Sequence, residues 1–150
     1  MAGFEKLKDP DVAELTTFLR RADLTVAGLD DPALRLWLLR DASGALIGST
    51  GFESSAAGDE VIIRSVAVAS ESRSAGLGTR LATHAIDEAR AAGARRAWLF
   101  SRRSGPFWQK LGFVPADRDE LAAALATTWQ VRLFTETGQL QRETAWSRAL

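Results

Sequence analysis

The sequence predicts an α/β fold of the α+β kind, with a mixed, mostly antiparallel central sheet, helices on both faces and one parallel strand–helix–strand unit. Three observations predict it. A β-branched run at 61–68 is followed by a glycine-containing loop and a helical pattern that ends near Gly93. Two strand patterns, 35–40 and 45–53, flank a turn. A further apolar run at 97–101 follows the helix, and a strand in that place returns parallel to the first run.

Length and composition limit the class of protein. The 150 residues suit one domain with a buried core, so we expect a single domain over 1–150. The 19 Lys and Arg balance 19 Asp and Glu, which gives no basic field for nucleic acid. The chain has no cysteine and one histidine, which excludes disulfides and thiolate nucleophiles and predicts no metal site. We find no membrane-length apolar run and no signal-peptide pattern, and expect a cytoplasmic protein without a membrane partner.

The first quarter of the chain predicts a short strand, a helix and a loop. Residues 1–7 suit a short strand. Asp9 is placed to cap a helix, and Pro10 suits its first position. Apolar residues at helical spacing continue to about Arg21. Residues 24–32 then predict a loop.

An antiparallel hairpin is predicted next. Strands at 35–40 and 45–53 flank a turn at 41–44, whose Asp, Ser and Gly are typical turn residues. A second, looser turn at 54–59 leads into the central strand. The sheet therefore begins as an antiparallel meander.

The central unit contains a candidate anion site. The loop at 72–78 precedes a helix that ends near Gly93, with one apolar face. That face consists of Leu77, Leu81, Ala82, Ala85, Ile86 and Ala89. A helix N-terminus has unpaired N–H groups and a positive dipole end, and glycines let the backbone approach an anion such as a phosphate. Arg73 adds a positive charge. The alternative is a plain strand-to-helix turn whose glycines serve only the bend.

The last third predicts shorter elements. A short helix is expected at 107–113 and an alanine-rich helix at 119–128. Residues 129–134 suit either a strand or an ordered loop. Gly138 marks a turn, and 144–148 suit the final strand.

The glycine loop does not fit the two commonest phosphate loops. No Gly-Lys-Ser/Thr follows it, and the third glycine of the dinucleotide fingerprint is missing. Arg-x-x-Gly-x-Gly at 73–78 after "SVAV" instead resembles the acetyl-CoA loop of the GCN5-related N-acetyltransferase (GNAT) family. The segment 97–101 resembles the family's next strand, and 107–113 its short helix with the "Lys-x-Gly-Phe" ending. The match covers about half of the chain.

A finer resemblance concerns a subgroup of that family. "Gly-Phe-Glu" at 51–53, "Arg-Ser-x-Ala-Val" at 64–68 and the helix after Arg118 resemble the arsenic-resistance and amino-acid N-acetyltransferases. The subgroup's cysteine-proline near the tail is replaced here by Thr135-Glu136.

The family resemblance implies an acetyl-CoA-dependent N-acetyltransferase that acts on the amine of a small molecule, with an amino acid or an amino-acid-like toxin as candidate. The alternative is a non-catalytic module of the same fold that binds acetyl-CoA as a sensor or partner. The resemblance also makes a homodimer through the C-terminal strand conceivable.

It further implies a gap between the central strand and the next one for the pantetheine arm of acetyl-CoA. Backbone groups of Val66 and Val68 would pair with the cofactor, and the amides of 73–79 would hold its pyrophosphate. The cofactor-binding residues so implied are Val66, Ala67, Val68, Arg73, Ser74, Ala75, Gly76, Leu77, Gly78, Thr79, Ser101, Phe107 and Trp108.

Few side chains suit acid–base chemistry. Glu53, at a strand end, is the first candidate for a general base acting through water, and a plain surface carboxylate is the alternative. The family's proton-donating tyrosine is replaced by Trp108, whose indole cannot donate a usable proton. Ser101 is a candidate weak hydroxyl donor; its alternative is a turn or cap residue.

Two side chains are candidates for substrate binding. Arg64 interrupts an apolar strand, where a charge is costly unless it is paired or faces a cleft. A guanidinium suits bidentate binding of a substrate carboxylate, and the alternative is an ion pair with Glu53 or Glu60. Trp129 is expected to line the substrate pocket, where Glu53 would also lie.

Overall fold

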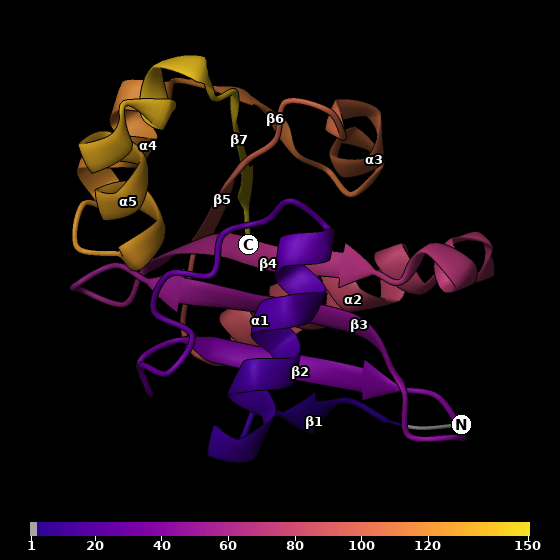
Figure 1. Cartoon of the computed structure of the whole chain (residues 1–150). Helices are drawn as coiled ribbons and strands as arrows, with labels where there is room; N and C mark the ends of the chain where they lie inside the picture. Colours follow the sequence, from indigo (N-terminus) through magenta and orange to yellow (C-terminus); the bar gives the residue numbers. More distant parts are fainter. Residues whose placement is uncertain (1–2) are drawn as a thin grey trace.

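The computed structural model describes residues 3–150, without the side chains of Ser74 and Ala75. Over that range the strands form one seven-stranded sheet in the order β1-β2-β3-β4-β5-β7-β6 (Figure 1). The strands are β1 Glu5–Lys6, β2 Arg35–Arg40, β3 Leu46–Ser54, β4 Glu60–Val68, β5 Arg96–Phe100, β6 Val114–Ala116 and β7 Ala145–Ala149. All neighbours pair antiparallel except β4 and β5, which pair parallel. The predicted fold class is confirmed.

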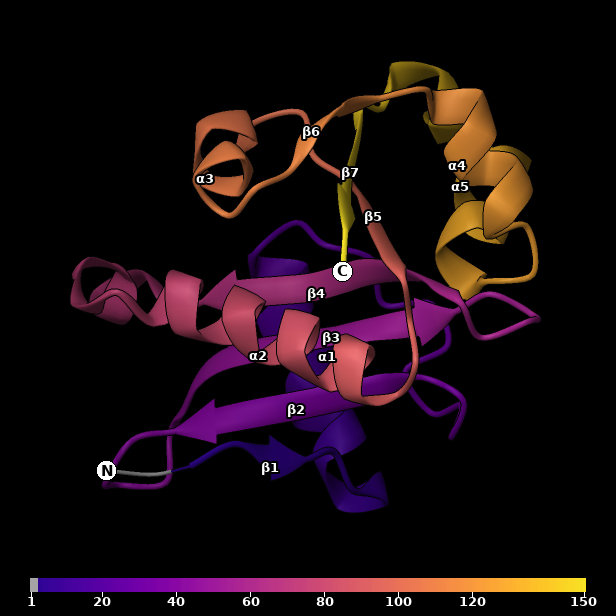
Figure 2. The same ribbon diagram turned by 180° about the vertical axis from the view of Figure 1, so that it is seen from behind.

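Helices cover both faces of this sheet. The α-helices are α1 Val12–Arg21, α2 Leu77–Ala91, α3 Gly105–Lys110, α4 Arg118–Ala124 and α5 Trp129–Thr137, and the 3₁₀ turns are η1 Asp9–Asp11, η2 Ser70–Ala75 and η3 Gln139–Arg142. Helix α1 lies over one face, and α2 over the opposite face, which Figure 2 turns toward the reader. Between residues 3 and 150, none of the helices has the length and apolar character needed to cross a bilayer.

The core follows the predicted helix faces. All six apolar positions predicted for α2 are buried. On the other face of the sheet, Leu15 and Leu19 of α1 are fully buried with Leu36 and Leu38 of β2. Burial of each such leucine stabilises the fold by about 1.5–3 kcal/mol. Gly93, at φ +99°, lies just beyond the end of α2, as predicted.

Two helix beginnings differ from the sequence prediction. Asp9 does not cap α1: the 3₁₀ turn η1 comes first, and its N-cap residue is Lys8, whose N–H donates to the Asp11 carboxylate at 3.0 Å. The predicted glycine loop is also more ordered than expected, because residues 70–75 form the turn η2. Gly76, at φ +72°, is the left-handed residue between that turn and α2.

The prediction of a strand or loop at 129–134 is wrong, since these residues belong to α5. Thr128 caps this helix by accepting the Val131 N–H at 3.3 Å. The Trp129 and Gln130 N–H groups donate to Glu53, far away in the sequence. Local propensity of the Trp, Val, Leu and Phe side chains pointed to a strand, and these distant contacts stabilise the helix instead.

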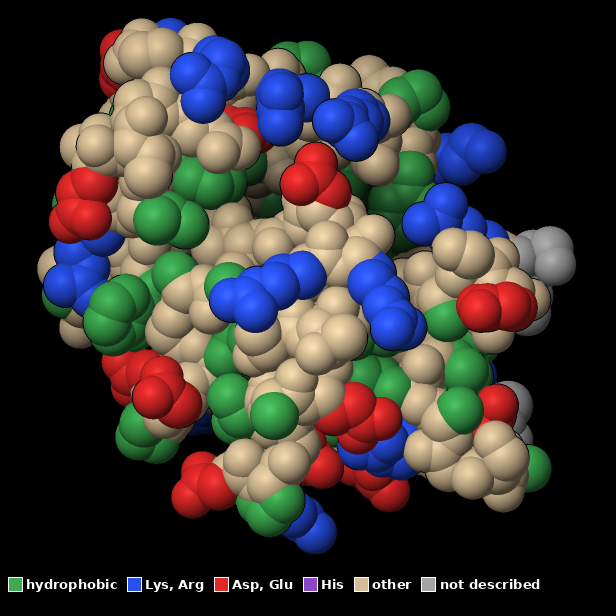
Figure 3. Space-filling view, in the orientation of Figure 1, with side chains coloured by type: hydrophobic (Ala, Val, Ile, Leu, Met, Phe, Trp, Pro, Cys, Tyr) green, Lys and Arg blue, Asp and Glu red, His purple; other side chains and the backbone are tan. Residues whose placement is uncertain are grey.

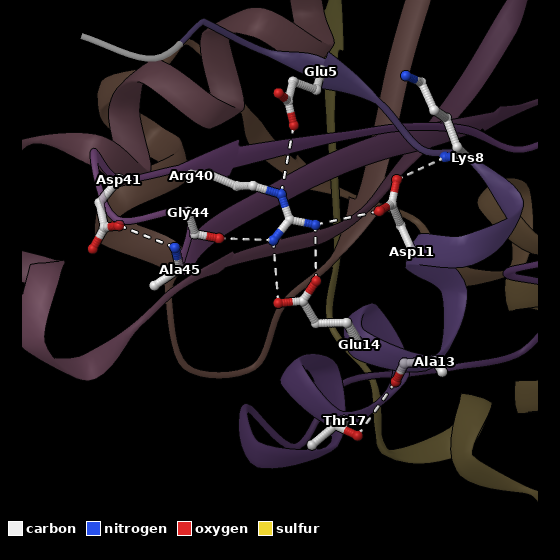
Figure 4. Close-up of polar contacts among 10 residues, drawn as sticks. All are labelled: Glu5, Lys8, Asp11, Ala13, Glu14, Thr17, Arg40, Asp41, Gly44 and Ala45. Carbon is white, nitrogen blue, oxygen red and sulfur yellow. Dashed lines mark hydrogen bonds and ion pairs between the residues drawn. The ribbon is translucent and has the colours of Figure 1, made fainter.

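Arg40, at the end of β2, gathers the N-terminal elements into one polar cluster (Figure 4). Its guanidinium forms ion pairs with Glu14 at 2.8 Å, Asp11 at 3.3 Å and Glu5 at 3.5 Å. It also donates to the carbonyl of Gly44 at 3.1 Å. The bond to Glu14 and the surrounding carboxylates raise the pKa of Arg40, although partial burial opposes them. One side chain therefore links β1, η1, α1 and the β2–β3 turn.

Arg40→Ala is expected to lower the free energy of unfolding by about 1–2 kcal/mol, because a network of ion pairs exceeds a single exposed pair in value. Urea denaturation at low and at 1 M salt measures this, and the effect shrinks at high salt if charge pairing is its cause. The matched control is Arg35→Ala, on the exposed start of the same strand. Equal losses for both variants would contradict the role given to Arg40.

His84, the only histidine of the chain, lies on α2 and packs against two aromatic rings from other parts of the chain. Its imidazole stacks on Phe4 with 4.0 Å between ring centroids and meets Trp37 edge-on at 4.9 Å. Burial lowers the pKa of His84, and the carboxylates of Glu88 and Asp87 oppose that shift. The neutral ring is therefore the form that the fold favours.

The lowered pKa of His84 predicts the direction in which the free energy of unfolding changes with pH. The folded protein binds the His84 proton less tightly than the unfolded chain, so unfolding takes up a proton as pH falls below about 6.5. We expect the free energy of unfolding to decrease between pH 7 and pH 5.5, and His84→Phe to flatten this part of the curve. Urea denaturation at half-unit pH steps measures it. An unchanged slope in His84→Phe would assign the effect to other groups.

Candidate active site

A gap opens in the middle of the sheet where β4 and β5 separate. Their parallel pairing covers only Glu60–Ile62 against Arg96–Trp98. Strand β4 continues to Val68, so its edge facing β5 has no strand partner from Ile63 onward within the described chain. In Figure 1, β1 to β4 lie side by side with alternating directions, whereas β5 and β7 are steeply inclined to them. The expected gap between the central strand and the next one is present.

A β-bulge in β4 shapes the same region. Gly51 of β3 pairs with Arg64, and Ser49 pairs with Ala67, so Ser65 and Val66 share one partner position. Ser65 has φ +62°, a conformation uncommon for a non-glycine residue, and its carbonyl accepts the Ser49 hydroxyl at 2.7 Å. Because a bulge redirects side chains, it can place Arg64 and Val66 differently from regular strand neighbours.

The gap contains a cavity of about 650 Å³, within the range of small-molecule sites. We group some of its lining residues by element into two sets, named the first half and the second half. The first half includes Val66, Ala67, Val68, Arg73, Gly78, Phe107 and Trp108. The second half includes residues 22–25, Arg64, Phe100, Gln130, Phe134, Gln139 and Glu143. Lys and Arg side chains lie on both sides of the hollow on this face in Figure 3.

The first half has the features needed for a pantetheine diphosphate. The N–H groups of residues 77–79, in the first turn of α2, have no intrahelical acceptor, and no side chain caps this end of the helix. A Cβ added to Gly78 would stand 3.5 Å from Phe107, so a larger side chain there would enter the cavity. The open β4 edge and the positive helix end together fit a slender anionic cofactor. Leu77 is buried in the core, and its side chain only packs.

Glu53 and Arg64 form a buried ion pair at 3.1 Å, with 4% and 5% exposure. The carboxylate accepts three hydrogen bonds, from Arg64, from Trp129 N–H at 2.6 Å and from Gln130 N–H at 3.1 Å. Glu53 thus stands at the positive N-terminus of α5. The described cavity lining does not include it. The role of Glu53 as a general base stays a prediction, whereas its hydrogen bonds to the start of α5 are present in the structure.

Arg64 bonds to Glu53 and also to the loop before β2. Its guanidinium donates to the carbonyls of Ala27 at 2.8 Å and Thr25 at 3.2 Å, and its Nε donates to Ser65 at 3.2 Å. Burial lowers the pKa of Arg64, and Glu53 opposes this. The ion-pair alternative is therefore realised with Glu53, while Glu60 bonds Trp98. A bidentate grip on a substrate carboxylate would have to displace a protein acceptor, because four of five guanidinium N–H groups are used.

Ser101 and Trp108 lie where β5 and α3 meet the cavity. The Ser101 hydroxyl accepts the Ser104 N–H at 3.0 Å, which leaves its own proton to donate. Trp108 is 7% exposed and meets Phe107 and Phe113 edge-on at 5.0 and 5.3 Å. Its ring is thus a wall of the cavity that is held by aromatic packing.

Trp129 lies on the outer side of α5. It is 37% exposed, covers Gly28 and donates its indole N–H to Asp31 at 2.8 Å. The Ala33 amide and then this indole lower the pKa of Asp31. The described lining contains the next residue, Gln130, but not Trp129. The ring of Trp129 thus packs against the loop that contains Gly28 and Asp31, and its role in substrate binding stays a prediction.

Several lining residues are not among the predicted site residues, and Gln130, Phe134 and Glu143 are examples. A helical reading of 129–137 places Gln130 and Phe134 four residues apart on one face. That spacing was the available signal, and it was not used because residues 129–134 were expected to form a strand or an ordered loop. Glu143 lies in the turn before β7, where no periodicity marks it.

The sheet is splayed between β4 and β5, and the gap holds a cavity with the start of α2 beside it. The chain belongs to the acetyltransferase (GNAT) family, whose model matches residues 4–113. No curated protein matches the chain.

Several solved structures share the fold. N-acetylglutamate synthase from Neisseria gonorrhoeae, complexed with coenzyme A and N-acetyl-glutamate, has a TM-score of 0.77 at 19% identity, over 100% of this chain and 35% of that chain. The present chain thus spans about a third of the synthase. Rv2747 from Mycobacterium tuberculosis, in complex with CoA and NLQ, has a TM-score of 0.77 at 15% identity and covers 99% of both chains. Tetrahymena GCN5 has a TM-score of 0.74 at 13% identity, over 98% and 95%. At these identities the likeness shows the fold.

Glu53→Gln is expected to lower the free energy of unfolding by about 3 kcal/mol, because it leaves Arg64 buried without a counter-charge. The double variant Glu53→Gln/Arg64→Met should lose less than the sum of the two single variants. Urea denaturation measures all three. Glu71→Gln, on the exposed turn η2, is the matched control. Additive losses would show that the two side chains do not act as a pair.

Proposed function

We propose that this protein is an acetyl-CoA-dependent N-acetyltransferase whose acceptor is the amine of a small molecule. The observation that carries the proposal is the cavity between β4 and β5, which begins at the uncapped N-terminus of α2. Membership of the GNAT family and neighbours crystallised with coenzyme A support it.

The cofactor-binding residues are proposed from the first half of the cavity. The N–H groups of 77–79 and the Arg73 guanidinium would hold the diphosphate, with Gly76 providing the left-handed entry to the helix. Ser74, Ala75 and Thr79 would contribute backbone only. The open edge of β4 at Val66, Ala67 and Val68 would pair with the pantetheine amides, and Phe107, Trp108 and Ser101 would flank the arm.

Acetyl-CoA supplies the acetyl group as a thioester: the amine nitrogen forms the new C–N bond, the C–S bond breaks, and the proton that nitrogen loses ends on the released thiol. The side chains near the cavity need only orient the amine and exclude water. Ser101, which lines the cavity, would donate its hydroxyl proton there. An α-amino group, with a pKa of about 8, needs little help from a base at neutral pH.

An amino acid or an amino-acid-like toxin is the acceptor that we propose, in line with the amino-acid N-acetyltransferase resemblance. The second candidate function is a non-catalytic acetyl-CoA sensor. It is favoured by the tryptophan at position 108 and by the hydrogen bonds that occupy both Glu53 oxygens. Release of thiol from acetyl-CoA in the presence of any amine would exclude the sensor.

Calorimetry with acetyl-CoA is the first test of the proposed function, and binding at micromolar concentration is expected. Gly78→Leu should weaken that binding by about tenfold or more, because its side chain would enter the cavity. Thr83→Leu, at an exposed position further along the same helix, is the matched control. Equal affinity of the wild type and Gly78→Leu would exclude this cavity as the cofactor site.

Thiol release with acetyl-CoA across amino acids, polyamines and aminoglycosides is the second test. Turnover is expected with at least one amino acid. Binding of acetyl-CoA without turnover of any of these amines would favour the sensor.

A further inference from the structure

Among the described carboxylates, Glu143 alone combines burial with a place in the cavity lining. The acidic side chains of that lining are Asp23 and Glu143. The side chain of Asp23 is 85% exposed, whereas that of Glu143 is 6% exposed. Glu53, the base predicted from the sequence, is outside the described lining, and both of its oxygens accept hydrogen bonds. Glu143 therefore has the position that Glu53 lacks.

The Glu143 carboxylate has one oxygen with protein partners and one without. Its Oε2 accepts from Gln139 Nε2 at 2.8 Å and lies 3.4 Å from Arg102 Nε. Its Oε1 accepts no hydrogen bond within the described chain. Because Oε1 is not one of the fully buried atoms that lack a partner, it keeps accessible surface. Gln139 and Arg102 line the same cavity, so this free oxygen lies among side chains that a bound ligand would contact.

The main chain holds Glu143 next to the end of β5. The carbonyl of Thr144, the next residue, accepts the Ser101 N–H at 2.9 Å. The Glu143 N–H donates to the carbonyl of Leu140 at 3.1 Å, and the Glu143 carbonyl accepts from Arg118 Nη1 at 3.4 Å. Since Ser101 is one of the residues proposed to flank the cofactor arm, Glu143 lies beside the proposed path of that arm.

We propose that Glu143 is the general base of the reaction and that its Oε1 takes a proton from the bound ammonium group. The inference rests on the proposed function and names the residue that makes the amine nucleophilic. The ammonium gives one proton to the carboxylate, which passes it to solvent. The neutral nitrogen then forms the C–N bond as the C–S bond breaks, and a second proton from the nitrogen ends on the released thiol.

The help that a base gives here is modest but measurable. An α-amino group has a pKa of about 8, so roughly a tenth of it is neutral at pH 7 and roughly nine tenths at pH 9. Without the base, the enzyme can use only the neutral fraction. The charged groups that face Glu143 are Arg102, from the loop after β5, and Arg118, from α4, and arginine side chains stay charged over this range. The loss should therefore follow the titration of the amine.

The experiment measures thiol release from acetyl-CoA by the full chain between pH 7 and pH 9, with the amino acid that the wild type uses best. For Glu143→Gln we expect kcat/KM for the amine to fall about tenfold at pH 7 and to lie within about twofold of the wild type at pH 9. Affinity for acetyl-CoA, measured by calorimetry, should be unchanged. Glu136→Gln, an exposed carboxylate on α5, is the matched control.

The wild type supplies a second measurement that does not depend on how well a variant folds. Because the base lets it use the ammonium form, its kcat/KM should change by less than about threefold between pH 7 and pH 9. A tenfold rise over that range would show that only the neutral amine reacts, and would overturn the assignment.

A loss in Glu143→Gln of the same size at pH 7 and pH 9 would also overturn it, since a structural role has no reason to follow the ionisation of the amine. So would the absence of any loss at pH 7, or the pH-dependent loss in Asp23→Asn instead. These outcomes leave the proposed function standing, whereas no thiol release by the wild type with any amine would remove that function and this inference with it.

Discussion

The buried pair of Glu53 and Arg64 is the contact on which the second half of the cavity depends. Desolvating two charges is costly, and their mutual attraction alone often fails to offset that cost. Here both ions have further partners: two N–H groups at the start of α5 for Glu53, and two loop carbonyls for Arg64. The pair thereby fixes the loop at 25–27 and helix α5 to the sheet, and these segments bring Gln130 to the cavity.

A second constraint is the free edge of β4. Buried backbone N–H and C=O groups require partners, and an open edge inside a protein invites an extended ligand. Strand β4 pairs with β3 on one side, with the bulge at Ser65. On its other side, within the described chain, it has no strand partner after Ile62. The same strand is therefore a paired element of the sheet on one side, and under the proposed function its other edge would bind the cofactor arm.

Sequence reasoning succeeded where the signal is local. The α2 face, the hairpin of β2 and β3 and the parallel unit each follow from periodicity and turn residues, and the structure confirms them. It failed at α5, because the anion that stabilises the helix start lies 76 residues earlier in the chain. It left the role of Arg64 open for the same reason: its acceptors Ala27 and Thr25 are brought close only by the fold.

The two halves of the cavity differ in how far their charged side chains are paired. Arg64 is neutralised by Glu53, Arg102 lies near Glu143, and Arg103 lies 3.9 Å from Asp23. Arg73, next to the positive end of α2, has no ion pair within the described chain, so uncompensated positive charge collects where a diphosphate would lie. The charged side chains of the second half are close to electrically balanced. Under the proposed function such surroundings would favour an uncharged amine over an ammonium ion, and the uncharged form is the nucleophile.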